Sequence, residues 1–186
     1  MLRRPALAAL AIALVVPLAA CTEATRIPDA EPSSAVAPLF ASDEEALAAA
    51  TAAYEEYLLL SNSITENPDS EIELLREATT SEYFEEVESA VQSLREQGLV
   101  TMGTTQLQSA QLQQHFQDLD GQAVVIMYAC IDVSAVRVLD ATGTDQTPAE
   151  REELVNLEVE FQSSVEDDNL RISRSDVWTG GSLCTS

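Results

Sequence analysis

The spacing of apolar residues predicts a long first helix that begins at Ser42 and ends near Leu60. Within this stretch apolar side chains recur every three to four positions, as one face of a helix requires, at Leu47, Ala50, Tyr54, Tyr57 and Leu58. Ser42 and Glu45 have the residue types and the spacing of a capping box, in which both side chains accept hydrogen bonds from backbone N–H groups at the helix start. Asp43 and Glu44 add negative charge where the helix dipole favours it.

Two shorter helices are predicted after it. Asn67, followed by a proline, suits the start of the first of these, and Ile72 and Leu75 give that helix a small apolar face. A second capping box spans residues 79–82. The apolar stripe that follows it predicts the third helix, at Tyr83, Phe84, Val87, Val91 and Leu94. Gly98 suits the end of this helix because glycine readily adopts the left-handed conformation of a helix C-terminus.

Beyond these helices the period of the pattern falls to two, which is typical of strands. Residues 100–116 are β-like but polar, and residues 122–133 form a strongly apolar strand. The Asp-Leu-Asp-Gly sequence at residues 118–121 predicts a hairpin turn between them. Residues 155–165 alternate apolar and polar side chains, and residues 170–178 form the last strand. We therefore expect about four antiparallel strands.

Helices that come first and strands that follow them predict an α+β domain, here at residues 42–186. We expect three N-terminal helices packed on an antiparallel sheet of about four strands, and no second domain. In order and size the elements from Ser42 to Trp178 resemble the nuclear-transport-factor-2-like cone, of the broader cystatin-like architecture. That resemblance implies a curved sheet that encloses a pocket together with the long helix.

The first 21 residues have the pattern of a bacterial lipoprotein leader. Arg3 and Arg4 supply positive charge, and residues 6–16 are an unbroken apolar run that is too short to span a bilayer comfortably. The Leu-Ala-Ala-Cys sequence at residues 18–21 resembles the lipobox. This resemblance implies cleavage before Cys21 and attachment of a diacylglycerol to its thiol, with further acyl chains such as palmitate. An ordinary signal peptide that is cut at the same bond, next to an incidental cysteine, is the alternative.

The predicted organisation is a leader at residues 1–20, a flexible tether at residues 21–41 and one domain. The tether holds three prolines and no periodic apolar stripe. A lipid on Cys21 would hold the protein at the outer face of the cytoplasmic membrane, because two or more acyl chains bind a bilayer durably. The lipobox, the acidic tether and a cysteine pair together resemble small actinobacterial lipoproteins with a cone domain.

The charge balance excludes several classes of partner. The chain has 32 acidic residues, 9 arginines and no lysine, and its formal net charge is -23. Because this charge repels phosphate and anionic head groups, we expect no nucleic-acid partner and a domain that stays off an anionic membrane surface. The same charge attracts cations or a basic partner, although an acidic surface also keeps a secreted protein soluble and monomeric.

Cys130 and Cys184 remain once Cys21 is assigned to the lipid. Export places both in an oxidising compartment, so we predict a disulfide between them. The loop that this bond closes is long enough for the chain-entropy model to give about 4 kcal/mol of stabilisation. One buried thiol and one exposed thiol are the alternative.

Four residues are candidates for acid–base chemistry in the pocket that the cone resemblance implies. Tyr54 and Tyr57 lie on the apolar stripe of the first helix, Asp132 lies near the end of the apolar strand, and His115 is the one histidine of the chain. A neutral imidazole beside a buried carboxylate moves protons near neutral pH. The alternatives are core packing for the tyrosines and solvent exposure for the other two, because none of the four falls in a recognisable motif.

Metal and cofactor chemistry has no support in the sequence. One histidine and a cysteine pair committed to a disulfide leave no ordinary zinc site. Residues 140–151 space their oxygen atoms somewhat as an EF-hand loop does, but Asp145 and Arg151 stand where that loop requires glycine and glutamate. We therefore expect no metal and no cofactor.

These observations predict a lipid-anchored, extracytoplasmic protein that binds a small apolar ligand or a cell-envelope partner without catalysis. A small enzyme of isomerase or dehydratase type, which uses tyrosine, aspartate and histidine side chains in the pocket, is the alternative. The lack of a catalytic motif in the sequence favours the binding function.

Overall fold

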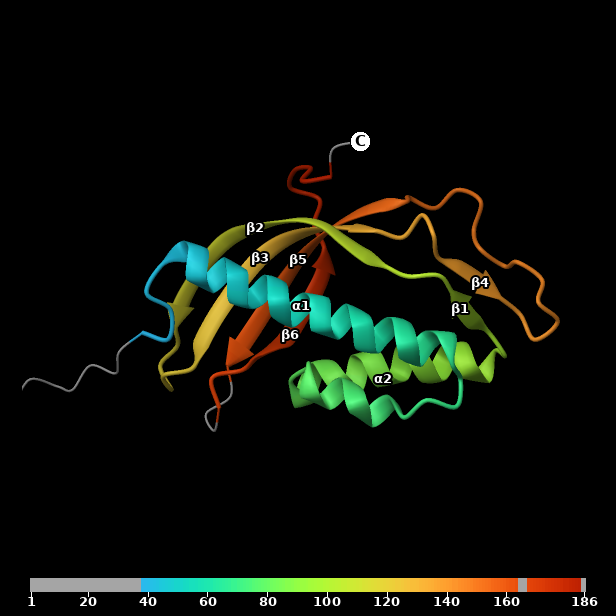
Figure 1. Cartoon of the computed structure of the whole chain (residues 1–186), viewed down its shortest axis with the longest axis horizontal. Helices are drawn as coiled ribbons and strands as arrows, with labels where there is room; N and C mark the ends of the chain where they lie inside the picture. Colours follow the sequence, from blue (N-terminus) through green and yellow to red (C-terminus); the bar gives the residue numbers. More distant parts are fainter. Residues whose placement is uncertain (1–37, 164–166, 185–186) are drawn as a thin grey trace, which may run out of the picture. The chain divides into compact units, whose positions relative to one another are not determined.

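The computed structural model describes residues 38–163 and 167–184, which form an α+β domain (Figure 1). Helices come first along the chain and strands follow, so the predicted fold class is confirmed. The predicted leader, Cys21 and almost all of the predicted tether lie outside the described residues. Within the described ranges, no helix is both long and apolar enough to cross a bilayer.

Helix α1 (Asp43–Glu66) crosses one face of the main sheet (Figure 1). Its start confirms the predicted capping box, because Ser42 Oγ accepts a hydrogen bond from the Glu45 N–H group at 3.2 Å. The Glu45 side chain accepts a second one from the Ala41 N–H group at 2.8 Å, one residue before the cap. These bonds satisfy backbone donors that the helix itself leaves unpaired.

The same helix continues past Leu60, where the sequence pattern predicted its end. Ile64 adds a further buried position to the apolar stripe and is 1% exposed, in a small core shared with η1 (Ile72–Glu77) and α2 (Ser81–Glu96). This burial stabilises the additional turns. The helix stops just before Pro68, since a proline disfavours helical conformation in the residue that precedes it.

The middle one of the predicted helices, η1, is a 3-10 helix and not an α-helix. Its six residues make it longer than most segments of this tighter form. Helix α2 begins after Thr80, whose Oγ1 accepts a hydrogen bond from the Tyr83 N–H group at 3.4 Å, so the cap is one residue later than the predicted box. Gly98, at φ 67°, ends α2 as predicted, and its N–H group donates to the Arg95 carbonyl.

Within the described residues, the main sheet consists of antiparallel strands in the order β2-β3-β5-β6. They are β2 (Gln106–Gln117), β3 (Ala123–Asp132), β5 (Leu154–Ser163) and β6 (Leu170–Val177). The predicted hairpin turn between β2 and β3 is present. Gly121 adopts φ 84° there, and its N–H group donates to the Asp118 carbonyl at 3.2 Å.

Residues 100–116, which the pattern predicted as one β-like stretch, form two strands. The first, β1 (Val100–Met102), lies outside the main sheet and pairs with β4 (Arg137–Leu139). Gly103 stands at the break with φ 88°, and a Cβ atom there would lie 2.2 Å from the Ala135 carbonyl oxygen. Only glycine permits this close approach of the two segments of the chain.

Strand β3 is buried on both faces of the sheet. Val125, Met127 and Ala129 face the core beneath α1, where Tyr54 and Phe161 also lie. Side chains at the alternate positions of β3, Cys130 among them, face the other side because successive residues of a strand point in opposite directions. The space between α1 and the sheet is therefore filled by side chains of the protein itself.

Candidate functional site

The structure places the two tyrosine candidates in the hydrophobic core. Tyr54 is 2% exposed, stacks on Tyr57 with 6.0 Å between ring centroids, and meets Phe161 edge-on at 6.4 Å. Tyr83 of α2 joins them, 6.5 Å from Tyr57. Burial raises the pKa of all three phenols above the ordinary value, because a charged phenolate would be poorly solvated there. These rings therefore pack the core, and Tyr83 reaches it from the predicted apolar stripe of the third helix.

His115 lies on β2 and connects that strand to the start of α1. Its Nε2 atom is 3.1 Å from Asp43 Oδ1, and its side chain is 23% exposed. The ring also meets Phe40 edge-on at 6.2 Å. His115 therefore holds the first turn of α1 against the sheet.

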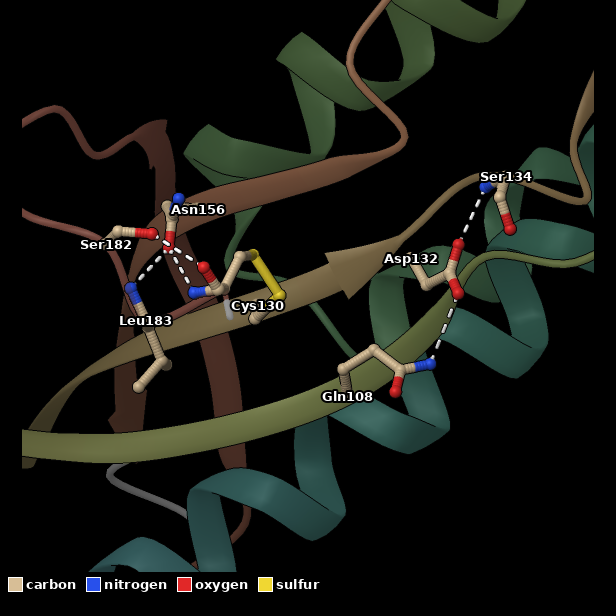
Figure 2. Close-up of a disulfide and its surroundings, with 8 residues drawn as sticks. Gln108, Cys130, Asp132, Ser134, Asn156, Ser182 and Leu183 are labelled. Atoms are coloured by element: carbon tan, nitrogen blue, oxygen red, sulfur yellow. Dashed lines mark hydrogen bonds between the residues drawn. A yellow bond between two sulfur atoms is a disulfide. The ribbon is translucent and has the colours of Figure 1, made fainter. Parts of the chain in front are cut away.

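Asp132 lies at the opposite end of the β2–β3 hairpin from His115. In the sheet register Asp132 is opposite Gln106, whereas His115 is opposite Val125 near the turn. Figure 2 shows the Asp132 carboxylate accepting hydrogen bonds from the Ser134 N–H group at 2.8 Å and from the Gln108 amide at 3.4 Å. Hydrogen bonding by the side chain and backbone of Ser134 lowers the pKa of this carboxyl. The structure places His115 and Asp132 at opposite ends of the hairpin, so the four acid–base candidates do not form one site.

The disulfide predicted from the sequence is present between Cys130 and Cys184, with Cα atoms 5.2 Å apart (Figure 2). Asn156 of β5 supports it, because its Oδ1 atom accepts hydrogen bonds from the N–H groups of Leu183 at 2.7 Å and of Cys184 at 2.9 Å. The backbone N–H group of Trp178 donates a hydrogen bond to the Asn156 carbonyl at 2.9 Å. The C-terminal segment is thus tied to the sheet face that α1 does not cover.

Trp178 gives the same face an aromatic cover over Tyr128, with ring centroids 4.0 Å apart. Gly180 and Gly181 follow closely, and a Cβ atom at either position would lie 2.8 Å from the indole ring. The tail can therefore pass over the Trp178 ring only because both residues lack a side chain. These contacts assign Tyr128 a packing role.

The oxygen-rich loop after β4 is a hydrogen-bonded turn. The Asp140 carboxylate accepts hydrogen bonds from the Thr142 hydroxyl at 2.7 Å and from the N–H groups of Thr142 and Thr144 at 2.9 and 3.0 Å. These hydrogen bonds lower the pKa of Asp140 to about 2, and the bond from the Thr142 side chain has the largest effect. The carboxylate oxygen atoms of Asp140 are thus used in hydrogen bonds within the loop. Across the described ranges, no three acidic, histidine or cysteine side chains converge as metal ligands.

Two polar hollows of about 550 Å³ each lie beside the start of β6, and Arg171 contributes to both. Alanine residues of α1 line one of them, and the other lies at the start of α2. The Arg171 guanidinium is committed to Asp167, which accepts hydrogen bonds from it at 3.0 and 3.4 Å. It therefore secures the turn before β6, and the hollows offer no unpaired cation at this position.

A third hollow, of about 400 Å³, has an apolar wall. We call it the Leu59 groove, and its lining consists of Glu55, Leu58, Leu59 and Asn62 of α1 together with residues 104–107. Leu59 is 73% exposed there. None of the four acid–base candidates lines this groove or either polar hollow.

Two hydrogen bonds fix the shape of the Leu59 groove. Asn62 Nδ2 donates to the Thr105 carbonyl at 3.1 Å, and Asn62 Oδ1 accepts from the Thr105 N–H group at 3.0 Å. One turn further along α1, Thr65 and Thr101 are joined through their hydroxyl groups at 2.8 Å. The wall formed by residues 104–107 is therefore held at a fixed distance from the helix.

Sequence reasoning missed the Leu59 groove, although one signal was available. Leu58, Leu59 and Leu60 are consecutive, and a helix buried on one face cannot place three adjacent residues in its core. The helical stripe accounts for Leu58, so an exposed leucine was to be expected beside it. The partner segment after Gly103 gave no such signal, because its position depends on the break between β1 and β2.

Comparisons with known proteins find a similar fold. No family model and no curated protein matches the chain. The intermembrane space region of the chloroplast protein ARC6 is similar at 16% identity and a TM-score of 0.51, over 70% of this chain and 95% of that one. A periplasmic fragment of TraM matches at 16% identity and a TM-score of 0.49, over 69% of this chain and 93% of that one.

At this identity the likeness to the ARC6 region establishes the α+β fold and nothing finer. No family is identified, so the resemblance to the nuclear-transport-factor-2-like cone stays a prediction. The disulfide is consistent with a location outside the cytoplasm, where such bonds form and persist. The function has to be argued from the geometry of the domain itself.

Proposed function

We propose that this protein is a membrane-anchored, extracytoplasmic binding domain that captures a protein partner of the cell envelope without catalysis. The leader delivers the chain across the membrane, and a lipid on Cys21 holds it at the outer face. The part of the predicted tether before Phe40 leaves the domain free to reach partners near that surface, whereas Phe40 itself is buried in the core of the domain. Support for the location comes from the lipobox-like sequence and from the disulfide.

The observation that carries the binding role is the exposed Leu59 in a preformed groove. A large apolar side chain that is 73% exposed beside further apolar lining is typical of an interaction site. The groove is open to solvent, so a segment of another protein can reach it. The space beneath α1, where the cone resemblance implied a small-ligand pocket, is occupied by Tyr54, Phe161 and their neighbours.

The alternative of a small enzyme lacks an assembled site among the described residues. General acid–base catalysis requires its groups within hydrogen-bond reach of a common substrate. Tyr54 and Tyr57 are core residues, His115 is engaged by Asp43, and Asp132 lies at the far end of the hairpin. Binding therefore remains the function that the geometry supports best.

The test is in-cell crosslinking of the protein in its native envelope, with Cys21→Ser as the unanchored comparison. We expect the wild-type protein in the membrane fraction, crosslinked to a defined envelope protein. The Cys21→Ser protein should leave the membrane fraction and lose most of that crosslink, because it is no longer concentrated at the surface. A wild-type protein that is released from the membrane, or that yields no crosslinked partner, would contradict the proposal.

A further inference from the structure

The helix face that presents Leu59 carries an acidic residue at each end. Glu55, Leu59, Asn62 and Glu66 recur at spacings of four, three and four residues, so they share one face of α1. A rise of 1.5 Å per residue places Glu55 and Glu66 about 16 Å apart along the axis, with Leu59 between them. Both glutamates are exposed, and neither forms an ion pair with a described residue.

Hydrogen bonds within the domain form the groove beside Leu59 before any partner arrives. Leu58 and Leu107 supply further apolar surface, and the paired hydrogen bonds between Asn62 and Thr105 hold the two walls together. Binding to such a preformed surface does not require ordering of the protein chain, which otherwise weakens affinity. No basic residue lines the groove. The groove therefore has an apolar middle and Glu55 at one end, and Glu66 lies one helical turn beyond Asn62, outside its lining.

We propose that the Leu59 groove binds an extended segment of an envelope protein in which one apolar side chain lies between two basic side chains. The proposal rests on the binding function proposed above and names the chemistry of the partner. The apolar side chain packs against Leu59, and the two basic groups pair with Glu55 and Glu66. A formal net charge of -23 adds long-range attraction for such a segment.

The spacing of the two glutamates sets the spacing of the basic residues. An extended chain rises about 3.3 Å per residue, so a span of about 16 Å corresponds to about five positions. Leu59 is nearer to Glu55 than to Glu66 along the helix. The apolar residue of the partner therefore lies about two positions from one basic residue and about three from the other.

A short fluorescein-labelled peptide of this design, with one leucine between two arginines, tests the proposal directly. Its anisotropy is measured with the folded mature chain at low and at high salt. We expect binding to the wild-type protein and none of a matched peptide with glutamate in place of arginine. Leu59→Gln should weaken binding at least about tenfold, as the loss of one buried leucine contact predicts. The Glu55→Gln, Glu66→Gln double variant should weaken it severalfold and reduce its salt dependence.

Leu119→Gln is the control, because Leu119 is fully exposed in the β2–β3 turn, away from the groove. Equal binding by the wild-type and Leu59→Gln proteins, or equal loss in Leu59→Gln and Leu119→Gln, overturns the groove assignment. The envelope crosslinking described above separates the two proposals. A crosslinked partner that Leu59→Gln leaves unchanged overturns only the groove, whereas the lack of any partner overturns the binding function itself.

Discussion

Asn62 on α1 and Thr105 before β2 are joined by two hydrogen bonds, although 43 residues separate them in the chain. The Asn62 side chain acts toward Thr105 as a neighbouring strand would, since it both donates to the backbone carbonyl and accepts from the N–H group. This contact connects the helix layer to the sheet at the Leu59 groove. It therefore links the stability of the domain to the shape of its proposed binding surface.

Asn62→Ala should lower the free energy of unfolding by about 1–3 kcal/mol, because the half-buried backbone groups of Thr105 lose their partners. Urea titration of the purified protein measures the change. Ser63→Ala is the matched control on the next residue of the helix, which is exposed, and should change stability by less than about 0.5 kcal/mol. Equal stability of the two variants would show that the Asn62 contact is unimportant.

Gly103 and Gly143 provide a matched pair of positive-φ glycines, at 88° and 80°. A Cβ atom at Gly103 would collide with the Ala135 carbonyl oxygen, whereas one at Gly143 has nothing within 4 Å. Alanine at either position pays the strain of its backbone conformation, about 1 kcal/mol. Gly103→Ala should lose clearly more, because β1 and β4 must also move apart. The comparison is made by thermal or urea unfolding, and an equal loss in both variants would refute the close approach.

Removal of the disulfide should destabilise the domain by about 4 kcal/mol in the chain-entropy model, since the bond closes a loop over a sequence separation of 54. The experiment compares Cys184→Ser with the parent protein in a Cys21→Ser background, with and without reductant. Hydrogen exchange should also show loss of protection at the Leu183 N–H group, which the tail donates to Asn156. An unfolding midpoint that reduction leaves unchanged would argue against this role.

The core tyrosines make stability sensitive to alkaline pH. Burial raises the pKa of Tyr54 above its ordinary value of 10.0, so the folded protein retains a proton that the unfolded chain releases. The full stability is thus present below about pH 10 and falls as the pH rises above that value. Unfolding by urea at a series of pH values should show this decline. Tyr54→Phe should make it shallower, and identical slopes for both proteins would contradict the assignment.

The fold class could be read from the sequence because each element carried its own local signal. The Ser42 cap, the Gly98 terminator and the hairpin turn at Gly121 all depend on residues close in the chain, and all are present. The disulfide was predictable for a different reason, since only two cysteines remained for an oxidising compartment. Features of this kind require no knowledge of tertiary contacts.

The features that sequence reasoning missed depend on contacts between distant segments. The extension of α1 to Glu66 is stabilised by the burial of Ile64 against η1 and α2, and the sequence does not show that these segments meet. The division of residues 100–116 follows from the approach of Gly103 to Ala135. By contrast, the separation of His115 from Asp132 was already implied by the predicted hairpin turn at residues 118–121, and the sheet register confirms it. The Leu59 groove combines a local signal with such a distant one, and so only its leucine was recognisable.

Mass spectrometry of the protein isolated from its native membrane tests the central claim most directly. Trypsin should release the N-terminal peptide 21–26, because Arg26 is the first arginine after the predicted cleavage site. Our account predicts that Cys21 begins this peptide and carries a thioether-linked diacylglycerol, and that no peptide from residues 1–20 remains. An unmodified Cys21 at the N-terminus, or a peptide that retains the leader, would contradict it.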